Sequence, residues 1–156
     1  MKKFFSLKIY GANEESVKDT ATLNDMIKNF GLENFIEILP AIFGADKKSV
    51  LENANLFVMT SRFEGLPMAL LEALSYSLPC FVTTGTNMAE EIQESGAGNI
   101  AKIDVANIAD ELLKLIEDFP ATYKAMSKNA NALAQKYSWS EIAKQSHEIY
   151  QNLGGQ

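Results

Sequence analysis

The sequence between positions 61 and 74 is Ser61-Arg62-Phe63-Glu64-Gly65-Leu66-Pro67-Met68-Ala69-Leu70-Leu71-Glu72-Ala73-Leu74. An almost wholly apolar run at 56–59 comes before it and predicts a buried strand. Pro67 suits the first position of a helix, where its missing N–H costs nothing, and the apolar spacing continues that helix to about Tyr76. A strand, a loop and a helix therefore follow one another at the centre of the chain.

The segments on either side repeat this alternation. Further apolar runs predict strands at 4–10, 35–39, 80–83 and 99–103. Helical spacing predicts helices at 15–30, 47–53 and 88–94, the first ended by Gly31. Strands that are apolar on both faces and alternate with helices indicate a parallel sheet covered on both sides. The expected fold class is α/β, a doubly wound (Rossmann-like) sheet whose ligand lies at the carboxyl ends of the strands.

After Ile103 the pattern is helical only. Asp104 is a good N-cap for a long helix, and Pro120 is well placed to begin the next one. Ser138 and Glu141 have the spacing of a capping box for a last helix. We therefore expect a helical C-terminal tail after the sheet.

Length and composition favour one soluble domain over residues 1–156. The net charge of −6 argues against binding to nucleic acid or to an anionic membrane. Cys80 is the only cysteine and His147 the only histidine, so neither an internal disulfide nor a zinc site is expected. The first apolar run is too short for a signal peptide and no run is long enough to span a membrane, which predicts a cytoplasmic protein.

The start of the central helix is a candidate phosphate site. Leu66, directly before Pro67, has no side-chain oxygen that could cap the helix, so the amides of Met68 and Ala69 need another acceptor. Free amides at the positive end of a helix dipole bind phosphate well. Gly65 allows a tight turn or a close approach of the backbone to a ligand.

Two carboxylates flank this helix start. Glu64 lies in the loop before it, and Glu72 lies within the helix. Carboxylates accept paired hydrogen bonds from vicinal hydroxyls, which both a ribose and a hexose present. The alternative is that neither residue binds a ligand: Glu64 merely stabilises the helix terminus, and Glu72 is a solvated helix residue. The residues alone leave both interpretations open.

The same stretch resembles a family signature. Glu64 and Glu72 stand as the Glu-x7-Glu motif of GT-B retaining glycosyltransferases of family 4 (glycosyl transferases group 1), in their C-terminal donor-binding domain. Further segments resemble the family in order and spacing at 7–11, 54–58, 78–86, 95–98 and 137–139. The resemblance covers nearly the whole chain and is more specific than the glutamate pair alone.

The resemblance implies a role for each matching position. Glu64 would contact the transferred sugar as the catalytic residue, and Glu72 would bind the ribose of a nucleotide-sugar donor. The implied donor-binding set is Gly11, Arg62, Gly65, Leu66, Met68, Ala69 and Glu72. Members of the family retain the anomeric configuration when they transfer the sugar to a glycan, lipid or protein acceptor, and they usually need no metal. The resemblance therefore implies neither a cofactor nor a metal for this chain.

The chain departs from the family in three ways. Pro67 replaces a frequent glycine, and Thr86-Asn87 replaces a second one. The basic side chains for the diphosphate, the first strand of this domain and the N-terminal acceptor domain all lie upstream in the family. We therefore expect the isolated chain to bind donor weakly and not to turn over. The alternative is a non-catalytic nucleotide- or partner-binding α/β module. A flavodoxin-like regulatory domain is disfavoured, because the sequence has neither an early acidic cluster at a strand end nor a phosphate loop directly after the first strand.

Overall fold

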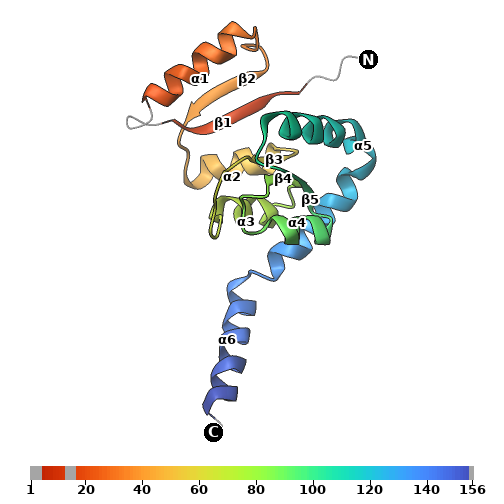
Figure 1. The fold of residues 1–156 in the computed structure, drawn as a ribbon. Coiled ribbons are helices and arrows are strands. Elements are labelled where there is room, and N and C mark those ends of the chain that lie inside the picture. Colours follow the sequence, from red (N-terminus) through yellow and green to blue (C-terminus); the bar gives the residue numbers. More distant parts are fainter. Residues whose placement is uncertain (1–4, 13–16, 155–156) are drawn as a thin grey trace. The chain divides into compact units, whose positions relative to one another are not determined.

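The computed structural model describes residues 5–12 and 17–154 (Figure 1). The chain divides into two compact units, Met1–Val50 and Leu51–Gln156, and each is described by itself. The organisation as a single domain stays a prediction. Within the described residues no helix combines the length and the apolar character that crossing a bilayer requires.

The first unit contains a β-α-β arrangement. Its elements are β1 (Leu7–Ala12), α1 (Val17–Asn29) and β2 (Ile36–Pro40). The two strands pair in parallel, with Ile9 opposite Ile38. Gly31 has a φ of 63° and ends the helical segment, as predicted from the sequence. The expected starts of the strand at Phe4 and of the helix at Glu15 lie outside the described residues.

The second unit is built on a three-stranded parallel sheet in the order β3-β4-β5. The remaining elements are α2 (Gly44–Asn53), which crosses the boundary between the units, β3 (Phe57–Met59), α3 (Met68–Ser75), β4 (Cys80–Thr83), α4 (Ala89–Ser95), β5 (Gly98–Ala101), α5 (Val105–Gln135) and α6 (Trp139–Gly154). Strands and helices alternate up to α5, so the predicted α/β class is confirmed.

The central strand β4 is fully buried, and its two faces pack in different clusters. Cys80 and Val82 lie in a cluster with residues of α3, α4 and the last part of α5. Phe81 lies in a second cluster with Leu115 and Met126 of α5. Because neighbouring side chains of a strand point to opposite faces, helices cover this sheet on both sides. This explains why β4 carries no alternation of polar and apolar residues.

Pro120 does not begin a new helix, so that prediction is wrong. It lies inside α5, which continues from Val105 to Gln135. A proline removes one helical hydrogen bond and crowds the preceding turn, and it therefore bends a helix when packing holds both parts. The ribbon of α5 changes direction where its colour passes from teal to blue (Figure 1). Leu115 before the proline packs in one cluster and Leu133 beyond it in the other, so a single helix serves both faces of the sheet.

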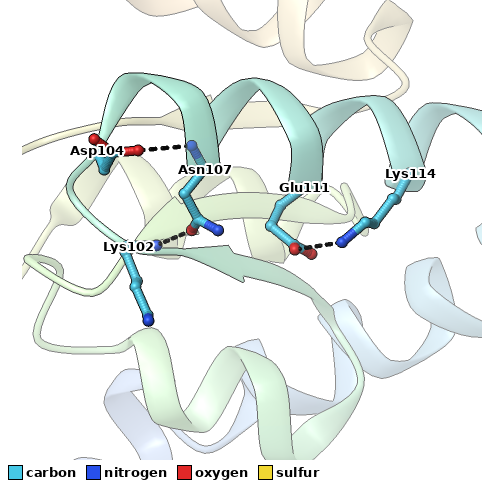
Figure 2. A network of polar contacts seen from close by, with 5 residues as sticks. All are labelled: Lys102, Asp104, Asn107, Glu111 and Lys114. Atoms are coloured by element: carbon cyan, nitrogen blue, oxygen red, sulfur yellow. Dashed lines mark hydrogen bonds and ion pairs between the residues drawn. The ribbon is translucent and has the colours of Figure 1, made fainter.

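The start of α5 matches the sequence prediction. The Asp104 carboxylate accepts a hydrogen bond of 2.9 Å from the Asn107 amide, as an N-cap does (Figure 2). The Asn107 side chain in turn accepts from the Lys102 amide at 2.7 Å, which ties the end of the sheet to the helix. Further along the exposed side, Lys114 and Glu111 form an ion pair of 2.8 Å. At α6, the Glu141 amide donates to the Ser138 hydroxyl at 3.3 Å, which confirms that cap as well.

Burial protects the only thiol of the chain. Cys80 is fully buried, its Sγ donates to the Leu78 carbonyl at 3.2 Å, and desolvation raises the pKa of the thiol far above its ordinary value. We expect Cys80 not to react with an aqueous disulfide reagent in native buffer and to react fully in urea, because only the accessible thiolate is nucleophilic. Rapid stoichiometric labelling of the native chain would contradict this placement.

Candidate functional site

The candidate site lies at the carboxyl edge of the three-stranded sheet, where the chain passes from β3 into α3. Met68 is the first residue of α3, and Pro67 is its N-cap with φ −78° and ψ 94°. The sequence analysis predicted the helix to begin one residue too early, at Pro67. The extended ψ of Pro67 leaves this residue outside the helix, as its N-cap. The Pro67 carbonyl accepts from the amides of Leu70 and Leu71, at 3.0 and 3.1 Å.

The first two amides of α3 have no protein acceptor among the described residues. Pro67 offers no side-chain cap, and the first backbone hydrogen bond of the helix is the one from Leu70. Met68 is 64% exposed and Leu66 is 59% exposed, so solvent reaches this end of the helix. The expected arrangement, free amides at a positive helix end, is therefore present.

Glu64 is held by backbone pairing with the loop that follows β4. Its amide donates to the Gly85 carbonyl at 2.9 Å, and its carbonyl accepts from the Asn87 amide at 3.1 Å. These two bonds make Glu64 the parallel bridge partner of Thr86. The loop after β3 thus runs beside the loop after β4 at the edge of the sheet, and Glu64 is half-buried there.

Two hydroxyls extend this attachment. Ser61 Oγ donates to Glu64 Oε1 at 2.9 Å. Thr83, the fully buried last residue of β4, donates its hydroxyl to the Ser61 carbonyl. The sequence reasoning did not single out either residue. The i,i+3 spacing of Ser61 and Glu64 is a signal that could have found the first, whereas Thr83 lies 22 residues away and has no local signal.

Gly85 allows the two loops to lie this close. A Cβ added there would stand 2.3 Å from the Arg62 carbonyl oxygen and 2.8 Å from that of Ser61. Only a glycine permits such contact without moving the backbone. Sequence reasoning missed this role, since the contact joins two loops that are distant in the sequence.

Glu72 lies in the second turn of α3 and is half-buried. Leu70, Ala73 and Leu74 around it are fully buried, so the helix is anchored in the core while Glu72 lies at its edge. At a rise of about 1.5 Å per residue, four residues place Glu72 roughly 6 Å along the axis from Met68. The structure therefore brings both glutamates onto one loop-to-helix junction, on either side of the free amides.

The other predicted site residues are distributed as follows. Arg62, Gly65 and Ala69 are exposed on the same junction. Gly11 belongs to the first unit, where the register of β1 shifts, and its φ of 124° favours glycine. Among the described residues no three His, Cys, Asp or Glu side chains are grouped as a metal site would require.

A cavity of about 370 Å³ lies elsewhere, at the amino end of β5. Gly98, Asn99 and the Glu111–Lys114 pair of α5 are among its lining residues. Parallel α/β sheets bind their ligands at the carboxyl ends of the strands, which is the edge that holds Glu64. We therefore place the candidate site at the junction and not at this cavity.

Comparison with known proteins gives a consistent result. The family model of glycosyl transferases group 1 matches residues 2–133. The GDP-mannose:cellobiosyl-diphosphopolyprenol alpha-mannosyltransferase of Komagataeibacter xylinus is 25% identical over 145 residues, which are 92% of this chain and 37% of that protein. The UDP-Gal:alpha-D-GlcNAc-diphosphoundecaprenol alpha-1,3-galactosyltransferase of Escherichia coli is 27% identical over 116 residues, 72% of this chain and 30% of that protein.

Solved structures share the fold. HepE of Anabaena in complex with UDP has a TM-score of 0.79 at 22% identity, over 96% of this chain and 41% of that chain. Sucrose-phosphate synthase of Thermosynechococcus elongatus has a TM-score of 0.79 at 18% identity, over 95% of this chain and 38% of that chain. The chain spans about two fifths of the length of these proteins.

Proposed function

This chain belongs to the glycosyl transferases group 1 family, and on that premise we propose that it is the donor-binding domain of a glycosyltransferase that uses a nucleotide-sugar. The observation that carries the proposal is the junction itself. Two amides without a protein acceptor among the described residues begin α3. Glu64 lies before them, held by hydrogen bonds from the protein, and Glu72 lies after them on the helix.

Each part of the junction suits one part of such a donor. The amides of Met68 and Ala69, at the positive end of α3, are donors for a diphosphate. Glu72 can accept hydrogen bonds from the two vicinal hydroxyls of a ribose, and Glu64 from hydroxyls of the sugar that is transferred. The helix end also stabilises the negative charge that develops on the leaving diphosphate as the bond to the sugar breaks.

The finer features of the reaction are part of the proposal. We propose transfer with retention of configuration, as in family 4, without a metal ion, in the cytoplasm. Two relatives are named for transfer to sugars on diphosphopolyprenol or diphosphoundecaprenol, which supports a lipid-linked glycan as the acceptor of the whole protein. Arg62, exposed on the same junction, completes the proposed donor-binding set of this unit.

Titration of the chain with UDP, GDP, UDP-glucose and GDP-mannose tests the proposal, for instance by isothermal calorimetry. We expect one nucleotide and its sugar conjugate to bind with a Kd of about 1 mM, because the proposed contacts come mainly from backbone amides and two carboxylates. Binding of none of the four would contradict the proposal.

Glu72→Ala should weaken the binding of the preferred nucleotide at least about tenfold, since a hydrogen bond to a charged group contributes roughly 1.5–3 kcal/mol. The matched control is Glu94→Ala, which removes an exposed glutamate from α4, away from the junction. The control should bind as the unchanged chain does. An unchanged affinity in Glu72→Ala would remove Glu72 from the site.

A further inference from the structure

We propose that Ser61 and Thr83 are positioning residues, which hold the carboxylate of Glu64 in the orientation that the donor sugar requires. This inference rests on the proposed function, because it assigns to Glu64 the contact with the sugar. It adds a polar chain that begins in the core of the sheet and ends on the carboxylate.

This series of hydrogen bonds begins on the buried central strand. Thr83 is the last residue of β4, which is buried on both faces and paired with a strand on each side. Its hydroxyl is fully buried and donates to the backbone carbonyl of Ser61. The position of Ser61 is therefore set by the best-packed strand of the unit and not by the exposed loop alone.

Ser61 in turn holds the side chain of Glu64. Its carbonyl accepts from Thr83, while its own hydroxyl donates to Glu64 Oε1 at 2.9 Å. Among the described residues no protein donor reaches Glu64 Oε2. One carboxylate oxygen is thus engaged by the protein, and the second can accept from a ligand hydroxyl.

The main chain of Glu64 is fixed by a separate set of contacts. Its amide and carbonyl both pair with the loop after β4, at Gly85 and Asn87. Backbone pairing alone leaves the side-chain torsions of a glutamate free. The contact from Ser61 removes that freedom before a ligand arrives, so less side-chain entropy is lost on binding.

A neighbouring threonine provides the matched control. Thr86 is only 2% exposed and lies in the loop directly after β4, yet its hydroxyl has no hydrogen-bond partner among the described residues. Thr83→Val and Thr86→Val are the same chemical change at two buried sites, of which only the first breaks the polar chain. A comparison of their melting temperatures separates loss of this hydrogen bond from the general effect of the substitution.

The test compares a nucleotide-sugar with the bare nucleotide, in whichever base series the unchanged chain prefers. Ser61→Ala should weaken the nucleotide-sugar about three- to tenfold and the nucleoside diphosphate less than about twofold, because only the former contacts Glu64. Ser61→Thr retains a hydroxyl and should restore most of the difference. Ser95→Ala, which removes a hydroxyl bonded to a backbone carbonyl in α4, should change neither affinity.

Thr83→Val should show the same selective loss, with Thr83→Ser as its rescue. In Thr83→Val, which removes the hydrogen bond to the Ser61 carbonyl, amide hydrogen exchange at Glu64 and Asn87 should accelerate, and this readout needs no ligand. In Ser61→Ala, exchange at both amides should stay as in the unchanged chain, because their hydrogen bonds do not involve the serine hydroxyl. Equal weakening of nucleotide and nucleotide-sugar, or unchanged binding and exchange, would overturn the inference while leaving the donor site in place. Absence of any nucleotide binding, together with the accelerated exchange, would refute the proposed function and retain the polar chain as a structural feature.

Discussion

Gly98→Ala should destabilise the unit Leu51–Gln156 by about 4 kcal/mol or more, the range of the most damaging single substitutions. Gly98 is the first residue of β5 and lies opposite Cys80 in the parallel register. A Cβ at this position would stand 1.7 Å from the Cys80 carbonyl oxygen and 2.6 Å from its carbonyl carbon. Both are backbone atoms of the central strand, so no side-chain rotation can relieve the overlap.

The central strand β4, which the added Cβ would push, is held in place on both faces. Cys80 and its successors in β4 are buried on both faces, and the Cys80 amide also donates to the Ala97 carbonyl at 3.0 Å, just before Gly98. Displacing β5 would therefore break its pairing with β4 and open both clusters of apolar side chains. Urea denaturation followed by circular dichroism measures the effect, and Cys80 labelling should become rapid in the variant.

Gly65→Ala is the control for this change. A Cβ at Gly65 would have no neighbour within 4 Å, and the residue is exposed. The substitution should be neutral or stabilise the unit by up to about 1 kcal/mol, because alanine restricts the unfolded chain. Equal stability of the Gly98 and Gly65 variants would show that the register of β4 and β5 is wrong.

Gly85→Ala should have its largest effect on binding rather than on folding. The added Cβ would stand 2.3 Å from the Arg62 carbonyl oxygen, which pushes the two loops of the site apart. Arg62 lies in an exposed loop that can yield, so we expect a loss of about 1–3 kcal/mol in stability. The pairing of Glu64 with Gly85 and Asn87 would be lost, and with it the position of the carboxylate.

Nucleotide-sugar affinity should consequently fall at least about tenfold in Gly85→Ala, a loss comparable to one charge-assisted hydrogen bond. Affinity for the nucleoside diphosphate should fall less, because Glu72 and the first amides of α3 do not depend on Gly85. Calorimetric titration of both ligands, with the melting temperature of each variant, checks the result. A variant that binds the nucleotide-sugar as the unchanged chain does would show that the Glu64 loop is not part of the donor site.

Most of the elements were predictable because their signals are local. The apolar run of β4 was predicted with the observed bounds, since a strand buried on both faces leaves an uninterrupted apolar segment. The caps at Gly31, Asp104 and Ser138 were also predicted, because each satisfies backbone groups within a few residues of itself. The boundary at Pro120 was wrong, because packing on both sides of the sheet holds the helix together across the proline.

The sequence by itself determined the α/β class, the order of the elements as far as the start of α5, and the helix start without a side-chain cap between two glutamates. These follow from periodicity, capping residues and the spacing of Glu64 and Glu72 along one short segment. Only the tertiary structure decided which atoms hold Glu64, why Gly85 and Gly98 have no room for a side chain, and how α5 reaches both faces of the sheet. Those features arise where β4 and its loop meet segments that are distant in the sequence, and contacts between separate segments depend on packing, which no local pattern in the sequence encodes.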